Sequence, residues 1–205
     1  MFDLKSDKVS AKVYIEEFFW IVNSNRESVP FLFNPIQSCL YESLTRNSLV
    51  LKSRKVGISS EVLALWLVAC LTCENTRAVV ISHEKVATER LLERVYYYIE
   101  NLPIKPSMKI ERRDEISFPE TNSSFWIGTA GSRAFGRGDD ITHLHISELD
   151  WWEDTGNLTG VLEACTADAW KVIETTANGF DSPFGRLWQR AKDQETEFST
   201  HFFGW

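Results

Sequence analysis

Apolar runs along the chain predict alternating strands and helices. A short run at Leu49–Leu51 and a β-branched run at Arg77–Ser82 have the length of buried strands. Residues 58–72 are apolar on nearly every side, which predicts a buried helix, and a second helix is expected from His83 to about Glu100. This order of strand, helix, strand and helix indicates a doubly wound α/β fold with a mostly parallel sheet.

The remaining segments extend this pattern at both ends. Residues 10–22 predict an amphipathic helix, and Pro30–Pro35 predicts an extended loop before another helix that begins at Ile36. From Met108 to Thr129, short strands between polar turns predict antiparallel hairpins added to the sheet edge. Further strands are predicted at 141–147, 170–174 and 197–205, with a helix at 183–193.

Length and composition favour a single domain. A chain of 205 residues with 43% apolar content can bury one sizeable core, so we expect one domain over 1–205, with 1–34 as an N-terminal helical extension. The longest apolar stretch, Val62–Leu71, is too short to cross a bilayer, and the N-terminus lacks a secretory signal, which predicts a cytoplasmic protein without membrane contact. A formal charge of −7 argues against tight nucleic-acid binding by this domain alone.

Two pairs of residues have the side chains of metal ligands. Cys70 and Cys73 have a suitable spacing, but no second pair accompanies them, so we interpret them as a reduced, buried helix end. His143 and His145 alternate with Leu144 and Ile146 on a predicted strand. They form either a metal site or two buried or edge-facing strand histidines.

The segment 47–60 has the outline of a phosphate-binding loop. A buried strand leads into a polar turn that ends at Gly57, and a helix begins at Ile58 with Ser59 in its first turn. Such a turn directs backbone N–H groups toward an anion, and the hydroxyl can reach Mg²⁺. The usual pattern, Gly-x-x-x-x-Gly-Lys followed by Ser or Thr, is incomplete, because the first glycine is missing and Ile58 replaces the lysine. The alternative is an ordinary strand, basic turn and helix.

Two later strands end in side chains that suit phosphate chemistry. One ends in Ser147 and Glu148, and another runs into Thr175 and Thr176 before an Asn-Gly turn. Carboxyl ends of parallel strands meet at one edge of a sheet, so these side chains are expected beside the loop. In the segment before the first of these strands, Arg133 and Arg137 lie among glycines and act either as transition-state cations or as solvent-facing loop charges.

In this order, the motifs resemble the ATPase domain of the large terminase subunit, the DNA-packaging motor of tailed bacteriophages and related viruses. The resemblance covers roughly residues 34–205. It rests on a glutamine before the loop strand, a deviant Walker A loop, an Arg-Gly pair, a Walker B strand and a coupling motif: Gln37, Lys52–Ser59, Arg137-Gly138, Ser147-Glu148 and Thr175–Gly179. The resemblance implies a P-loop NTPase fold of the ASCE type, with a central, mostly parallel sheet, flanking helices and an antiparallel edge.

The resemblance also implies roles for individual residues. ATP and Mg²⁺ are the expected cofactors, Glu148 is expected to polarise the attacking water, and Gln37 to contact adenine, although a helix-terminal glutamine can also face water. The predicted nucleotide-binding residues are Gln37, Lys52, Ser53, Arg54, Lys55, Val56, Gly57, Ile58, Ser59 and Ser60. The predicted metal-binding residues are Ser59 and Ser147. The predicted coupling residues are Thr175, Thr176 and Asn178, and the predicted catalytic arginines are Arg133 and Arg137.

The missing loop lysine requires a substitute, because backbone amides alone leave several phosphate charges under-compensated. Lys52 and Lys55 are the candidates, with Lys55 placed slightly ahead because it lies nearer the crown of the turn. Arg54 is expected either to bridge to a neighbouring strand or to face solvent.

The resemblance implies ATP-driven translocation of double-stranded DNA into a procapsid in the host cytoplasm. The expected partners are double-stranded DNA, bound weakly by the isolated domain, the portal protein, the small terminase subunit and further copies in a ring. A nuclease domain is expected after residue 205 in this family and is absent from this sequence. Two alternatives stay open: a helicase-like P-loop ATPase, and a non-catalytic nucleotide-binding domain with a degenerate loop.

Overall fold

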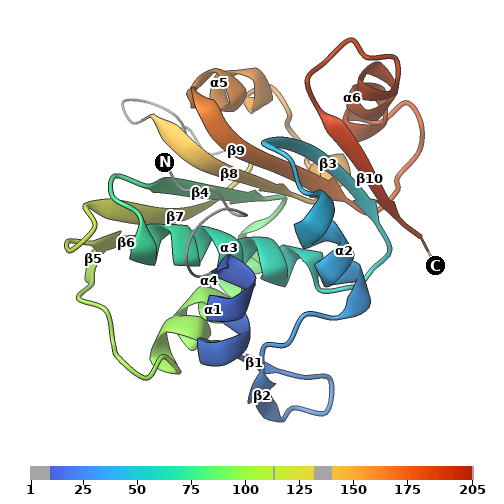
Figure 1. Cartoon of the computed structure of the whole chain (residues 1–205). Helices are drawn as coiled ribbons and strands as arrows, with labels where there is room; N and C mark the ends of the chain where they lie inside the picture. The colour runs from blue at the N-terminus through green and yellow to red at the C-terminus, as the bar shows by residue number, and fades with distance from the viewer. Residues whose placement is uncertain (1–9, 113, 132–139, 205) are drawn as a thin grey trace.

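The structure, a computed structural model, describes residues 10–112, 114–131 and 140–204. An eight-stranded sheet forms its centre, in the order β10-β3-β9-β8-β4-β7-β6-β5 (Figure 1). The six strands from β10 to β7 run parallel, and β6 and β5 add an antiparallel edge. The predicted α/β fold with its antiparallel edge is therefore confirmed. The strands span Asn47–Lys52 (β3), Arg77–Ser82 (β4), Lys109–Arg112 (β5), Glu115–Phe118 (β6), Ser123–Thr129 (β7), Ile141–Ser147 (β8), Cys165–Thr175 (β9) and Ser199–Phe203 (β10).

Helices cover both faces of the sheet, so each face has its own core (Figure 1). Four helices lie on one face: Ala11–Phe18 (α1), Pro35–Ser43 (α2), Ile58–Thr72 (α3) and Lys85–Glu100 (α4). Two helices lie on the other: Leu158–Glu163 (α5) and Pro183–Lys192 (α6). A 3-10 turn, Leu149–Trp151 (η1), follows β8 directly. Among the described residues, no helix has the length and apolarity needed to cross a membrane.

Helix α3 is buried along most of its length, as its uniformly apolar sequence predicts. It packs between the sheet and the helices α1 and α4, so residues from Val62 to Cys70 are all buried. Trp66 of α3 meets the ring of His143 edge to face, with 4.9 Å between the ring centroids. Burial lowers the pKa of His143 to about 4, so this side chain is neutral at pH 7. Both His143 and His145 are buried, as the alternative to a metal site predicted.

One part of the predicted secondary structure is wrong. The helix expected over 10–22 ends at Phe18, and Trp20–Val22 (β1) instead pairs with Ser28–Pro30 (β2) in a separate hairpin. Aromatic and β-branched residues suit strands as well as helices, and the tight turn between Asn23 and Glu27 closes the hairpin. The hairpins expected between Met108 and Thr129 are confirmed, because β5 pairs with β6 and β6 with β7 in antiparallel fashion, while β7 also pairs with β4 in parallel and so joins this edge to the central sheet. Helix α5 was not predicted from the sequence.

Candidate active site

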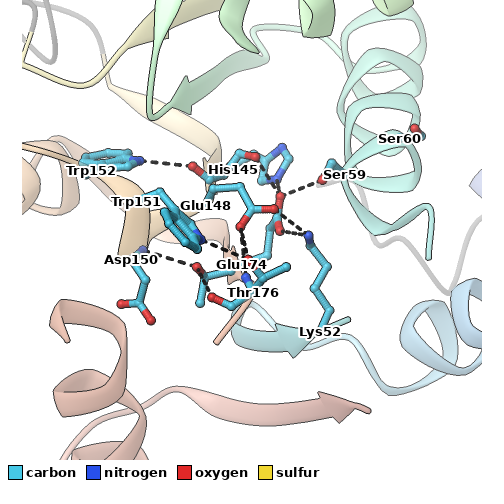
Figure 2. Close-up of polar contacts among 12 residues, drawn as sticks. Lys52, Ser59, Ser60, His145, Glu148, Asp150, Trp151, Trp152, Glu174 and Thr176 are labelled. Carbon is cyan, nitrogen blue, oxygen red and sulfur yellow. Dashed lines mark hydrogen bonds and ion pairs between the residues drawn. The ribbon is translucent and has the colours of Figure 1, made fainter. Parts of the chain in front are cut away.

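The candidate site lies where the carboxyl ends of β3, β8 and β9 meet the N-terminus of α3 (Figure 2). The parallel register places Leu51 beside Thr175 and Ser147 beside Glu174, so three strands end at the same edge. A cavity of about 800 Å³ opens there. It is lined by Val22, Asn23, Ser24, Lys52, Arg54, Lys55, Val56, Gly57, Ile58, Ser59, Ser60, His83, Arg94, Glu148, Trp151 and Thr176.

Most of the residues predicted to bind nucleotide are therefore brought together, and of that predicted set Gln37 and Ser53 do not line the cavity. The backbone N–H of Ser53 donates to the carbonyl of Phe203, so Ser53 ties the start of the loop to the edge strand β10. Sequence reasoning missed five residues that line this cavity. They are His83, Arg94, and the three residues that lead into the β1–β2 turn, Val22, Asn23 and Ser24. Each is remote in sequence from any phosphate-binding pattern.

The loop has the backbone of a tight anion-binding turn. Gly57 has φ +85°, and a Cβ at this position would lie 2.8 Å from Nε2 of Gln37. Lys55 also has a positive φ, of 63°. The first N–H groups of α3 have no partner within the helix, so they and the helix dipole are available to an anion.

Gln37 fixes the end of this loop. Its Nε2 donates to the carbonyl of Gly57 at 2.9 Å, and its Oε1 accepts from the backbone N–H of Asn34 at 3.0 Å. Asn34 donates to the carbonyl of Val56 at 3.1 Å. Both ends of the buried Gln37 amide are thus used inside the protein, and its contact with adenine stays a prediction.

Lys52 lies between two carboxylates. Its Nζ donates to Oε1 of Glu148 at 2.8 Å and forms an ion pair with Oε2 of Glu174 at 3.0 Å (Figure 2). Burial lowers the pKa of Lys52, but the charges of Glu174 and Glu148 outweigh burial and leave that pKa raised. Burial likewise raises the pKa of Glu174, but Lys52, His145 and Ser59 together depress it below its ordinary value. Lys52 and Glu174 are therefore both charged at neutral pH.

Glu148 is held in a defined orientation. Its φ of 56° is left-handed, and it caps η1 immediately after β8. Its Oε2 accepts from the backbone N–H of Thr176 at 3.0 Å and from Thr176 Oγ1 at 3.1 Å. Trp151 Nε1 donates to that same hydroxyl at 3.0 Å. The carboxylate therefore faces the cavity with one oxygen fixed by the end of β9 and the other by Lys52.

The predicted coupling residues connect β9 to the segment after β8. Thr175 Oγ1 accepts from the backbone N–H of Asp150 at 3.3 Å, and Asn178 Nδ2 donates to the Asp150 carbonyl at 3.0 Å. The Asp150 side chain accepts from the backbone N–H of Phe184 in the first turn of α6 at 2.9 Å. Asp150 was not singled out from the sequence, because nothing in its local pattern distinguishes it from a surface carboxylate.

Ser59 and Ser147 both hydrogen-bond to one carboxylate oxygen. Each hydroxyl donates to Oε1 of Glu174, at 2.7 Å for Ser59 and 2.8 Å for Ser147. Among the described residues, no group of three or more His, Cys, Asp or Glu side chains is placed to hold a metal ion. The hydroxyl and carboxylate oxygens nevertheless fit Mg²⁺, which proteins usually hold through few side chains together with substrate phosphates.

The other basic candidates have different surroundings. Lys55 is exposed at the crown of the loop, and the Arg54 guanidinium lies 5.8 Å from the Trp151 ring centroid, beyond the end of β8. Arg54 is itself exposed and lies near η1, and its expected bridge to the Walker B or coupling strand stays a prediction. Arg133 and Arg137 lie outside the described residues, so their catalytic roles stay predictions.

Solved structures with a similar fold include the ATPase domain of a phage large terminase. The Thermus phage P74-26 large terminase ATPase domain has a TM-score of 0.63 and 14% identity, over 83% of this chain and 80% of that one. The large terminase of another thermophilic bacteriophage gives 0.62 and 13%, over 78% of this chain and 41% of that one, and it has also been solved with ADP and with ATP-γ-S. A variant of S. cerevisiae Dbp5 bound to Gle1 gives 0.51 and 12%, over 75% of this chain and 42% of that one.

These similarities define the fold as that of a P-loop ATPase domain. More particularly, it is the fold of the ATPase domains of phage large terminases. No family model matches the sequence, and no curated protein matches it. With identities of 12–14%, the structural likeness establishes the fold alone.

Proposed function

We propose that this chain is the ATPase domain of a large terminase subunit, which hydrolyses ATP to drive double-stranded DNA into a viral procapsid. The observation that carries the proposal is the orientation of Glu148. Its carboxylate follows β8, faces the loop cavity and is held on one side by Thr176 and on the other by Lys52. A carboxylate fixed in this way beside an anion-binding loop suits activation of a water molecule.

In the proposed reaction, Glu148 accepts a proton from the water that attacks the terminal phosphate. The loop amides and the N-terminus of α3 bind the phosphates, and the cavity of about 800 Å³ is large enough for a nucleotide. Ser59, with Ser147 nearby, would hold Mg²⁺, which would neutralise phosphate charge when bound. The hydrogen bonds from Thr176 hold the Glu148 carboxylate at the wall of the cavity, and the attacking water would lie on that side of the nucleotide.

Lys52 is the better substitute for the missing loop lysine. Its ammonium group is already at the centre of the site and stays charged, whereas Lys55 is exposed at the loop crown. Phosphate oxygens would compete with Glu148 for Lys52, and release of Glu148 from this ion pair would free its Oε1 to accept a proton. This reverses the order of the two lysines favoured from sequence.

The partners follow from the proposed motor role. Double-stranded DNA, a portal protein, a small terminase subunit and further copies of the chain in a ring are the proposed partners, acting in the host cytoplasm. The net charge of −7 supports weak DNA binding by the single domain. Arg133 and Arg137 are proposed to stabilise the transition state, in their own subunit or in a neighbour.

Glu148→Gln tests the catalytic proposal. The amide keeps the shape of the side chain but removes the proton acceptor, so phosphate release should fall by about 100-fold or more while nucleotide affinity changes little. Exposed Glu153, a little further along the chain, provides a matched control, because Glu153→Gln removes the same charge outside the site. Equal turnover in Glu148→Gln and the parent would contradict the assignment. Nucleotide binding by the parent without any phosphate release would support the non-catalytic alternative.

Nucleic-acid stimulation separates the motor from the helicase-like alternative, which the similarity to Dbp5 supports. Phosphate release is measured at low salt with double-stranded DNA, single-stranded DNA or RNA added in turn. Stimulation by the duplex is expected for the motor. Stimulation by single strands alone would favour the helicase-like enzyme.

A further inference from the structure

Glu174 is a fully buried carboxylate at the centre of the site for which the sequence motifs provide no role. Its side chain is 0% exposed near the carboxyl end of β9. Its Oε1 accepts from Ser59 and from Ser147 and lies 3.4 Å from His145 Nε2, while its Oε2 pairs with Lys52 (Figure 2). Burial of a charge is costly, so a carboxylate held by this many polar partners invites a chemical explanation.

The position of Glu174 matches a missing charge on the neighbouring strand. β8 ends in Ser147, where the Walker B pattern places an aspartate, so β8 offers a hydroxyl and no charge. In the parallel pairing of β8 with β9, Ser147 and Glu174 are directly opposite each other. Their side chains are joined by the 2.8 Å hydrogen bond, so the Glu174 carboxylate occupies the space beside Ser147.

The hydrogen bond from Ser59 has a chemical consequence. Because the Ser59 hydroxyl donates its proton to Glu174 at 2.7 Å, its lone pairs are directed away from Glu174 and are available to a cation. Glu174 also places a negative charge one hydroxyl away from that cation. A partner behind a metal ligand orients the ligand and raises its basicity.

We propose that Glu174 supplies from β9 the acidic group that β8 lacks, and acts as the positioning residue for the Mg²⁺ that accompanies the nucleotide. The proposal rests on the proposed ATPase function and deepens it. Ser59 is the hydroxyl ligand, Glu174 orients it, and Ser147 holds Glu174 in place. Lys52 balances the charge of the Glu174 carboxylate when no metal ion is bound.

Binding of Mn²⁺ to the chain with a non-hydrolysable ATP analogue tests this proposal without measuring turnover. Electron paramagnetic resonance gives the Mn²⁺ affinity for the parent, Glu174→Ser, and the exchange variant that combines Ser147→Asp with Glu174→Ser. We expect Glu174→Ser to weaken Mn²⁺ binding by about 10- to 100-fold, as loss of an outer-sphere partner does. The exchange variant returns the acid to β8 and should recover most of that loss.

Glu61→Gln is the matched control. Glu61 is also a fully buried glutamate, on α3, but it does not line the cavity. Its replacement should leave Mn²⁺ affinity unchanged. If Glu174→Ser binds Mn²⁺ as the parent does, or if the exchange variant recovers nothing, Glu174 is only a counter-ion for Lys52 and the proposal is wrong.

Ser147→Asp alone decides the matter if the Glu174→Ser chains do not fold. This variant keeps Glu174 and adds a second carboxylate beside the same cation, so Mn²⁺ should bind more tightly, and unchanged affinity would overturn the proposal. The proposed function fails separately, since a parent chain that releases no phosphate either alone or assembled into a ring disproves it whatever Glu174 does.

Discussion

Replacement of Lys52 by methionine should destabilise the protein strongly, because it leaves two carboxylates facing each other without a cation. Lys52 is 8% exposed and its Nζ lies 2.8 Å from Glu148 and 3.0 Å from Glu174. Methionine retains much of the apolar stem, so the variant removes mainly the charge. Removal of one partner from a buried ion pair costs about 3–5 kcal/mol.

The expected cost corresponds to a clear change in melting temperature. For a domain of this size, each kcal/mol lowers Tm by about 2–4 °C, so the Lys52→Met variant should melt roughly 6–20 °C below the parent. Lys55→Met is the matched control, since Lys55 lies in the same loop but is exposed. Its effect should stay within about 0.5 kcal/mol. Thermal and guanidinium unfolding measure both variants at pH 8.

The pH dependence of unfolding gives a second signature of the same substitution. In the parent, the depressed pKa of Glu174 means that its stabilising contribution is present at neutral pH and is lost as pH falls through the depressed value. Without Lys52, burial raises the pKa of Glu174, so the variant should regain stability as pH falls from 8 toward 5. If Lys52→Met and Lys55→Met unfold alike at pH 8, Lys52 is not the cation that neutralises this site.

Two further substitutions test the loop and the core. Gly57→Ala should lower the free energy of unfolding in denaturant by about 1–2 kcal/mol and weaken nucleotide binding, because the position has φ +85° and the new Cβ would meet Gln37. Unchanged stability would show that the loop relaxes. Burial raises the pKa of Glu61 well above 4.5, so its folded form holds a proton that the unfolded chain releases, and stability falls as pH rises above about 4.5. Glu61→Gln should therefore stabilise the protein by about 1 kcal/mol or more at pH 8 and flatten this decline, and a less stable variant at pH 8 would contradict the reasoning.

Strands and helices that are buried on all sides could be predicted closely from sequence. The helix over 58–72 and the strand over 77–82 have the bounds that their apolar runs indicate. Trp20–Val22 was mispredicted because its side chains suit either structure, and the choice depends on pairing with Ser28–Pro30. Similarly, β9 begins at Cys165, before its apolar run, because its first residues pair with the start of β8.

The site residues could be predicted only where each belongs to a motif that is local in the sequence. Ser59, Glu148 and Thr176 each lie at the start or just past the end of an element, and the structure brings all three to one edge of the sheet. Glu174 was missed because a lone glutamate near a strand end has no motif of its own. Its significance depends on register, which places it opposite Ser147 and within reach of Lys52.

The end of β9 connects all parts of the proposed mechanism. Three consecutive residues make three different contacts. Glu174 accepts a hydrogen bond from the Ser59 hydroxyl, and Thr175 accepts one from the backbone N–H of Asp150. The backbone N–H of Thr176 donates to the Glu148 carboxylate. Because these residues lie together at the end of one strand, a small displacement of β9 would move both the partner of the Ser59 hydroxyl and the partner of the Glu148 carboxylate. Asp150 in turn contacts the first turn of α6, so we infer that the same displacement reaches a helix outside the site. In a DNA-translocating ATPase, this strand end would couple the state of the nucleotide to movement of the surrounding helices.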